Sequence, residues 1–312
     1  MKVNVDNFAR AETAAQFDRM VARAGGVNEF AHARVPTPLD KQDVIRMNRD
    51  TLYSFAVIDT SGGAAVEVPD AGDRYLSVMV VSLDHHVTRV IHTPGVHQLS
   101  DAAGEGDWVV AAARVLADPD DPEDLAEAHL LQDGLGVRAA SSRDWSHPDY
   151  DEDSLAETRD LLLALARGVS DTHGMFGAPG EVDPVRHLLG TAFGWGGLPE
   201  SEAFYVTQAE TMAVGDYTLT VGEVPVDAFW SITVYNRDGF LDENPYGAYS
   251  LNSVTARRGA DGTVTVRLAP EPADDAPNYL HVMDGWNYAV RLYRPRPEIL
   301  SGAWRFPTPV PD

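Results

Sequence analysis

The chain has 312 residues, 44% of them hydrophobic, and its 48 acidic and 24 basic residues give a formal net charge of −24. This length suffices for one large or two ordinary domains with a sizeable core. The charge disfavours nucleic acids and anionic membranes as partners, and the lack of cysteine excludes disulfides, thiol nucleophiles and cysteine-based metal sites.

The N-terminal part of the chain is predicted to form one helix followed by strands. Phe8, Phe17, Met20 and Val21 lie on one helical face, and Gly25-Gly26 is a suitable stop. The run Tyr75–Leu83 is apolar on both faces, which predicts a central strand. The strands expected here are rich in Val, Tyr and Phe and cover residues 51–58, 65–68, 74–83 and 108–115.

The middle of the chain favours helices that begin at acidic caps. The cluster 118–124 and the triplet Asp149, Asp151 and Asp153 both resemble calcium loops. The triplet lacks the glycine and the final glutamate of an EF-hand, so helix caps fit better than calcium ligands. Gly134–Ala139 imitates a dinucleotide fingerprint, but it follows a helix and is rejected. The helices expected here cover residues 122–132, 154–167 and 184–193, the last capped by Asp183.

The C-terminal third returns to strand patterns. Trp230, Ile232 and Val234 alternate with Ser231, Thr233 and Tyr235, the period of a half-buried strand. The strands expected cover residues 217–221, 228–235, 263–268, 279–282 and 287–293.

This order of elements predicts a mainly β chain with a helical connector, an α+β protein with two antiparallel, jelly-roll-like β-sandwich domains. We expect an N-terminal helix and β domain over 1–135, a helical connector over 136–204 and a second β-sandwich over 205–312. No apolar run approaches the roughly 20 residues that span a bilayer, and residues 1–30 lack a signal-peptide core. A cytoplasmic protein with no membrane partner is expected.

Several blocks of the sequence closely resemble the paired DUF1254/DUF1214 family. They are Val44–Ser54 with its Asn-x-Asp-Thr-Leu-Tyr-Ser run, Val109–Asp133, Asp183–Tyr205, Phe229–Asn252 and Trp286–Pro309. They span nearly the whole chain in the order of the family. The chain is short for the family, so it looks like a compact subgroup, which also carries Leu83-Asp-His-His86. The resemblance implies two β-sandwich domains and homo-oligomerisation, and it brings no catalytic mechanism with it.

The histidine cluster is one candidate for chemistry. Asp84, His85 and His86 are followed by His92 and His97. Three interpretations stay open: hydrogen-bonded structural histidines, acid–base catalysis, and a metal site that would need a turn and Asp84 as a ligand. Gly-x-Ser-x-Gly, P-loop, His-Glu-x-x-His and redox cofactor motifs are absent. No cofactor and no metal ion are therefore predicted.

Two further polar segments are candidates for ligand binding. Arg49 is suited to an anionic substrate group, with Asn48, Asp50 and Tyr53 beside it. Alternatively an Arg–Asp pair clips the strand to a loop. The other segment suits an uncharged polyhydroxylated or aromatic ligand, although its Asn and Tyr side chains also suit backbone capping. It comprises Trp230, Tyr235, Asn236, Asn244, Tyr249, Asn252 and Trp286.

The leading hypothesis is a small-molecule enzyme with a cleft between the two β domains and hydrolase- or lyase-type acid–base chemistry. In it His85 is the acid or base, Asp84 orients it, Arg49 holds the substrate, and His86 contributes to binding. Arg49, Tyr53 and His85 are expected to line one cavity. The other hypothesis is a non-catalytic ligand-binding or capsid-like assembly protein. Neither hypothesis identifies the small molecule.

Overall fold

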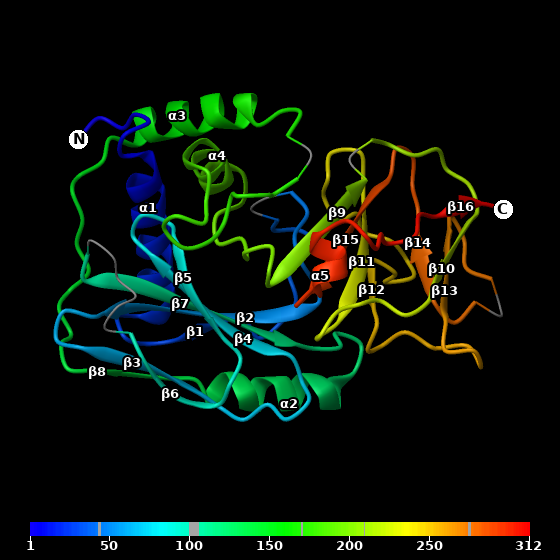
Figure 1. Cartoon of the computed structure of the whole chain (residues 1–312), viewed down its shortest axis with the longest axis horizontal. Coiled ribbons are helices and arrows are strands. Elements are labelled where there is room, and N and C mark those ends of the chain that lie inside the picture. The colour runs from blue at the N-terminus through cyan, green and yellow to red at the C-terminus, as the bar shows by residue number, and fades with distance from the viewer. Residues whose placement is uncertain (43–44, 100–105, 170, 209, 274–275) are drawn as a thin grey trace. The chain divides into compact units, whose positions relative to one another are not determined.

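The chain folds into two compact units. The computed structural model describes residues 1–42, 45–99, 106–169, 171–208, 210–273 and 276–312. The first unit comprises residues 1–34 and 51–199, and the second comprises residues 35–50 and 200–312 (Figure 1). The segment 35–50 thus leaves the first unit, packs in the second, and leads back into the first.

The first unit contains two antiparallel sheets. The five-stranded sheet has the order β1-β2-β7-β4-β5 and the three-stranded sheet the order β6-β3-β8. The strands of the larger sheet are β1 (Ala31–His32), β2 (Thr51–Asp59), β7 (Trp108–Leu116), β4 (Leu76–Ser82) and β5 (Val87–Ile91). Those of the smaller are β6 (Gly95–Gln98), β3 (Ala64–Val68) and β8 (Gly136–Ala139).

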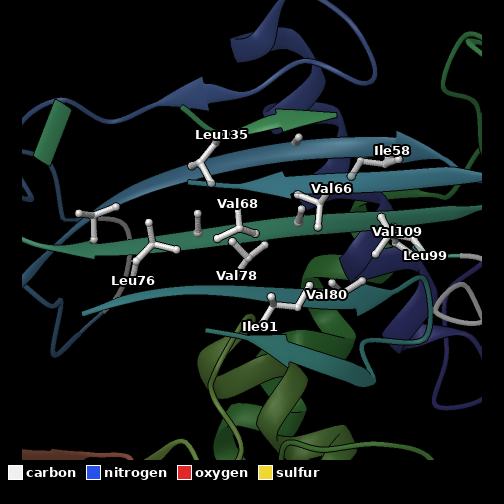
Figure 2. Close-up of a cluster of buried hydrophobic side chains, with 14 of the residues drawn as sticks. Ile58, Val66, Val68, Leu76, Val78, Val80, Ile91, Leu99, Val109 and Leu135 are labelled. Carbon is white, nitrogen blue, oxygen red and sulfur yellow. The ribbon is translucent and has the colours of Figure 1, made fainter. Parts of the chain in front are cut away.

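One hydrophobic core joins these two sheets. Val78 and Val109 from the larger sheet and Val66 from the smaller one belong to a single buried cluster (Figure 2). Helix α2 (Pro122–Asp133) adds Ala128 to the same cluster. All seven residues of β4 are buried, and the strand lies between β7 and β5. The central strand predicted from its two apolar faces is confirmed.

The remaining helices of the first unit form a second apolar cluster. Phe8 and Ala11 of α1 (Phe8–Ala24) pack with Leu155 of α3 (Glu152–Leu165) and Leu189 of α4 (Pro184–Gly194). The two helices expected within the 136–204 connector therefore pack on α1 in the first unit.

The acidic residues at the helix starts are caps. The Asp121 side chain accepts from the backbone N–H groups of the first turn of α2, Asp151 does so in α3, and Asp183 in α4. These bonds satisfy donors that a helix leaves unpaired at its start. Helix α1 ends at Gly25, whose φ of 81° is left-handed, as the Gly25-Gly26 stop predicts.

The second unit is a sandwich of two four-stranded sheets, with the orders β12-β11-β15-β9 and β14-β13-β10-β16. Its strands pair antiparallel except β13 with β14. Ile232 and Val290 of one sheet pack with Leu219 and Val266 of the other. The strands are β9 (Ala203–Gln208), β10 (Tyr217–Val221), β11 (Trp230–Tyr235), β12 (Ser250–Asn252), β13 (Val264–Ala269), β14 (Tyr279–His281), β15 (Asn287–Tyr293) and β16 (Val310–Pro311), with the short α5 (Pro297–Leu300). The mainly β, α+β fold class is confirmed.

Strand β11 is buried on both faces, and the half-buried strand predicted from its alternation is wrong. Trp230 and its apolar neighbours face the sandwich core. The polar residues between them are buried as well, because the segment 35–50 packs on the outer face of this sheet. Met47 and Leu39 pack there against the buried cluster of Tyr235, Leu241 and Ala289. Among the described residues, no helix is long and apolar enough to cross a membrane.

Candidate functional site

His85 is a fully buried residue with a left-handed backbone. Its φ is 63° and its side chain is 0% exposed. Its Nε2 accepts the N–H of Gly196 at 2.8 Å, so the proton of the neutral ring is on Nδ1, which lies 2.9 Å from the Thr191 hydroxyl. Thr191 in turn donates to the carbonyl of His187 at 2.9 Å. Burial, together with His187 and His86, holds the pKa of His85 well below its usual value.

The residues beside His85 also have structural partners. The Asp84 carboxylate bonds to Arg10 at 2.5 and 2.9 Å instead of to His85, and the Asp84 carbonyl lies 2.9 Å from Nε2 of His187. His86 stacks on His187 with ring centroids 4.5 Å apart, and burial lowers the pKa of His86. This geometry does not support His85 as the acid or base, because both its ring nitrogens are bonded inside the protein.

The downstream histidines, His92 and His97, lie next to backbone carbonyl groups. His92 Nδ1 lies 3.2 Å from the carbonyl of Leu76, and His97 Nε2 lies 2.9 Å from that of Thr93. No group of three His, Asp or Glu side chains suited to a metal ion occurs within the part of the chain that the structure describes.

A second group of polar side chains lies on the outer face of the β11–β15 sheet in the second unit. We call it the outer-face network: Arg46, Asp50, Ser231, Thr233, Tyr235 and Arg291. Arg291 donates to Thr233 at 3.1 Å, to the Tyr235 hydroxyl at 2.8 Å and to the carbonyl of Arg46 at 2.7 Å. Tyr235 donates to the carbonyl of Met47 at 3.0 Å. The network thus holds residues 46–47 against the sheet.

Asp50 is the incompletely satisfied member of this network. It is 2% exposed, and its Oδ2 accepts from the Ser231 hydroxyl at 2.6 Å. Its Oδ1 is buried and has no hydrogen-bond partner in the described ranges. Burial raises the pKa of Asp50, while Arg291 and the Ser231 hydroxyl act in the opposite direction. A buried carboxyl group with one unpaired oxygen is costly unless something else satisfies it.

Arg46 carries a second unsatisfied atom. Its φ is 54°, and its N–H donates to the carbonyl of Gly239 at 2.8 Å. Its Nε is buried with no acceptor among the residues described. Burial lowers the pKa of Arg46, Tyr235 opposes this, and the positive charge of Arg291 lowers it further.

The predicted substrate clamp, Arg49, has structural contacts in the second unit. Its Nη1 donates to the carbonyl of Thr37 at 2.6 Å, and its guanidinium lies 5.2 Å from the Tyr249 ring centroid. Asn48 accepts from the N–H of Asp50 at 2.6 Å and donates to the Tyr293 hydroxyl at 2.9 Å. These contacts clip the strand entry in place, and the Arg–Asp pair considered from the sequence stays a prediction.

The family-like block Phe229–Asn252 is called the C-terminal signature below. Its asparagines satisfy backbone groups, which is the backbone capping considered from the sequence. The Asn236 side chain accepts from the N–H groups of Asp238 and Phe240, and the Asn252 side chain from those of Val254 and Thr255. The Asn244 side chain does the same in its own turn. Trp230 and Trp286 belong to the sandwich core, being 3% and 0% exposed. These two tryptophans do not offer a ligand surface.

The structure therefore divides the predicted site residues between the units. The second unit brings together Asn48, Arg49 and Asp50 with Tyr235 and Tyr249. The first unit contains Asp84, His85, His86 and Tyr53. The ring centroid of Tyr53 lies 5.4 Å from the guanidinium of Arg114. The single cavity expected to contain Arg49, Tyr53 and His85 stays a prediction.

Sequence reasoning missed Arg46, Ser231 and Arg291 as site residues. Arg291 is the only charged residue in Asn287–Tyr293, and a lone charge within an apolar strand was the available signal. Arg46 belongs to the family-like block 44–54, called the N-terminal signature below, but its sequence context did not single it out.

Comparisons with known proteins identify the class of this chain. Residues 27–113 match the family DUF1254 and residues 207–297 match DUF1214, each described as a protein of unknown function. The chain belongs to the DUF1254/DUF1214 domain-containing proteins.

Solved structures support the same fold. The chain is similar to the VPA0106 protein from Vibrio parahaemolyticus, with a TM-score of 0.75, 18% identity and coverage of 99% of this chain and 97% of that one. It is also similar to a putative uncharacterized protein from Burkholderia cenocepacia, with a TM-score of 0.54, 15% identity and coverage of 97% and 87%. The search of curated proteins gave no match.

Proposed function

We propose that the chain is a small-molecule enzyme with hydrolase- or lyase-type acid–base chemistry, and that Asp50 is its acid–base group. The observation that carries this proposal is the buried, unpaired Oδ1 of Asp50. It replaces His85 in the role expected from the sequence, because both ring nitrogens of His85 are bonded within the protein.

The chemistry of Asp50 suits proton transfer. A general acid or base works best when its pKa lies near the working pH, and burial moves the pKa of Asp50 upward, toward that range. The Ser231 hydroxyl holds one carboxyl oxygen at 2.6 Å, which orients the other. A substrate hydroxyl or amine, or a water molecule, then supplies the missing hydrogen-bond partner at Oδ1.

Asp50→Asn tests this role because it keeps the shape of the side chain and removes the proton-transfer group. Purified protein is incubated with a metabolite extract, and consumed compounds are identified by mass spectrometry. We expect the wild type to deplete a small set of compounds and Asp50→Asn to deplete none of them. Ser231→Ala should lower the rate about tenfold, the effect of about 1.4 kcal/mol.

The control is Asp242→Asn, a like substitution at an exposed acid of the same unit. It should deplete the same compounds at the wild-type rate. Depletion by folded Asp50→Asn at the wild-type rate would remove Asp50 from the chemistry.

A non-catalytic ligand-binding or capsid-like assembly role is the second candidate. It is favoured by the contacts of Arg291, whose hydrogen bonds fasten residues 46–47 to the sheet as a scaffold would. On this alternative no compound is consumed. Light scattering of the purified chain tests the homo-oligomer that the family resemblance implies, and a monomer at all concentrations would count against assembly.

A further inference from the structure

We propose that Arg46, backed by Arg291, forms a subsite for an anionic group, a carboxylate or a phosphate, of a small-molecule ligand. The proposal rests on the proposed function only in calling that ligand a substrate, because anion binding can be measured without turnover. It assigns to Arg46 the task that the sequence suggested for Arg49.

The first argument is an unsatisfied charged donor. Arg46 Nε is buried without an acceptor in the ranges that the structure describes, whereas Arg49 donates to the carbonyl of Thr37. Leaving a buried charged donor unbonded costs more than leaving a neutral one. The rest of the Arg46 side chain is half-buried rather than enclosed, so a ligand can approach it.

The second argument is the local excess of positive charge. Arg46 and Arg291 interact electrostatically, and Arg291 bonds to the Arg46 carbonyl at 2.7 Å. The acid of the network is Asp50, whose pKa is raised by burial, while Arg291 and the Ser231 hydroxyl act in the opposite direction. The network holds two guanidinium groups and one carboxyl group, so its local charge favours an anion even in a chain whose net charge is −24.

The third argument is the way in which the backbone positions Arg46. Its φ of 54° is uncommon for a residue other than glycine and is maintained by tertiary contacts. The N–H of Arg46 bonds to the carbonyl of Gly239, in the turn that the Asn236 side chain closes. The backbone conformation of Arg46, which belongs to the N-terminal signature, is therefore held by a turn of the C-terminal signature.

The chemistry of the subsite follows from these groups. The Nε and one Nη of an arginine present two parallel N–H donors, which match two oxygens of a carboxylate or phosphate. Asp50 accepts a hydrogen bond from Ser231, and Ser231 pairs with Arg291 across strands β11 and β15. Asp50 therefore belongs to the same network. The substrate class is therefore a small anion that also carries a hydroxyl or amine, such as a hydroxy acid or a sugar phosphate.

The experiment measures anion binding to the full chain with sodium acetate and sodium phosphate as separate probes, and sodium chloride at equal ionic strength as the reference. The readouts are the melting temperature and the NMR resonance of the Arg46 side-chain Nε–H, assigned from its absence in Arg46→Gln. We expect one or both probes to raise the melting temperature above its value in sodium chloride. The chemical shift of this resonance should change with probe concentration until it reaches a plateau. The probe that binds more tightly distinguishes a carboxylate from a phosphate.

Variants decide whether Arg46 is responsible. Arg46→Gln should weaken the affinity for the probe at least about tenfold, the effect of about 1.4 kcal/mol, and Arg46→Lys should restore part of it. The matched control is Arg294→Gln, because Arg294 has a similar φ of 52° and is an exposed arginine of the same unit. Its affinity for the probe should equal that of the wild type.

Two results overturn the proposal: no difference between either probe and chloride, or equal affinity in folded Arg46→Gln. Asp50→Asn separates this proposal from the proposed function, since it should keep probe binding while losing turnover. Turnover that depends on Asp50 without any probe binding would reject the anion subsite alone. Probe binding with Asp50-independent turnover would reject the acid–base role alone.

Discussion

Asp59 and Asp50 are two buried aspartates with opposite surroundings, one in each unit. Asp59 is 0% exposed and accepts from Ser61, Ser141 and the guanidinium of Arg143. These hydrogen bonds outweigh burial and hold the pKa of Asp59 far below its usual value. Asp50 accepts from the Ser231 hydroxyl, and burial raises its pKa.

This difference distinguishes Asp59, a structural aspartate, from Asp50, a candidate for acid–base chemistry. The charge of Asp59 is balanced by bonds that tie β2 to residues 141–143, so its ionised form belongs to the folded state. The charge of Asp50 is not balanced in this way, and proteins keep such groups mainly where they have a task. Variants at each position sharpen or break this contrast.

The largest effect is expected at Asp59. Asp59→Ala removes the acceptor for two hydroxyl groups and for Arg143, so we expect the free energy of unfolding to fall by about 3 kcal/mol. Urea denaturation measures this. The control is Asp107→Ala, which removes the exposed carboxylate that also bonds Arg143 and should cost less than about 0.5 kcal/mol. Equal losses in the two variants would contradict the role of Asp59.

The next effect is expected at His85, whose satisfied surroundings resemble those of Asp59. His85→Ala leaves a cavity and removes the acceptor of the Gly196 N–H, so the free energy of unfolding should fall by about 2 kcal/mol. Anion binding and metabolite depletion should persist in the folded fraction. Loss of either activity in a fully folded His85→Ala would restore the acid–base role that the sequence suggested.

Asp50→Asn is expected to act in the opposite direction. A neutral side chain of the same shape avoids placing a charge in the interior, so at pH 7 the free energy of unfolding should stay constant or rise by about 1 kcal/mol. Chemical denaturation followed by tryptophan fluorescence measures this. A loss of 2 kcal/mol or more would place Asp50 with Asp59 among the structural acids.

The pH dependence gives the smallest and most specific test. Because the folded pKa of Asp50 is raised, its contribution to stability is complete below the unfolded pKa of about 3.9 and is lost as the pH rises through the folded value. Asp59, with its lowered pKa, contributes above about pH 3.9 and loses this contribution as the pH falls. The advantage of Asp50→Asn over the wild type should therefore grow with pH above about 4. A difference in the free energy of unfolding that does not change with pH would show that Asp50 has the same pKa in the folded and unfolded states.

Local patterns predicted much of the secondary structure. Strands β10 and β15 cover the ranges expected for them, 217–221 and 287–293, and α1 ends at the expected Gly25-Gly26 stop. Strands β5, β6 and β8, which the patterns missed, have only four or five residues. Their hydrogen bonds come from pairing with β4 or β3, and such pairing leaves little trace in a short run of residues.

The candidate site was less predictable, for a different physical reason. The sequence drew attention to both signatures and to the Asp50 and Tyr235 that they contain. It favoured Arg49 and His85 because these residue types suit binding and proton transfer. Their hydrogen-bond partners, Thr37 for Arg49 and Thr191 and Gly196 for His85, come from other segments. Whether a polar group is satisfied depends on such partners.

The sequence by itself determined the family, the mainly β class and the capped helices, because these depend on residues that are neighbours along the chain. The tertiary structure alone decided that residues 35–50 join the second unit and cover the outer face of its sheet. That covering buries Asp50 and part of Arg46. Burial removes the water that would otherwise satisfy their charges, so two ordinary polar residues become the candidate site.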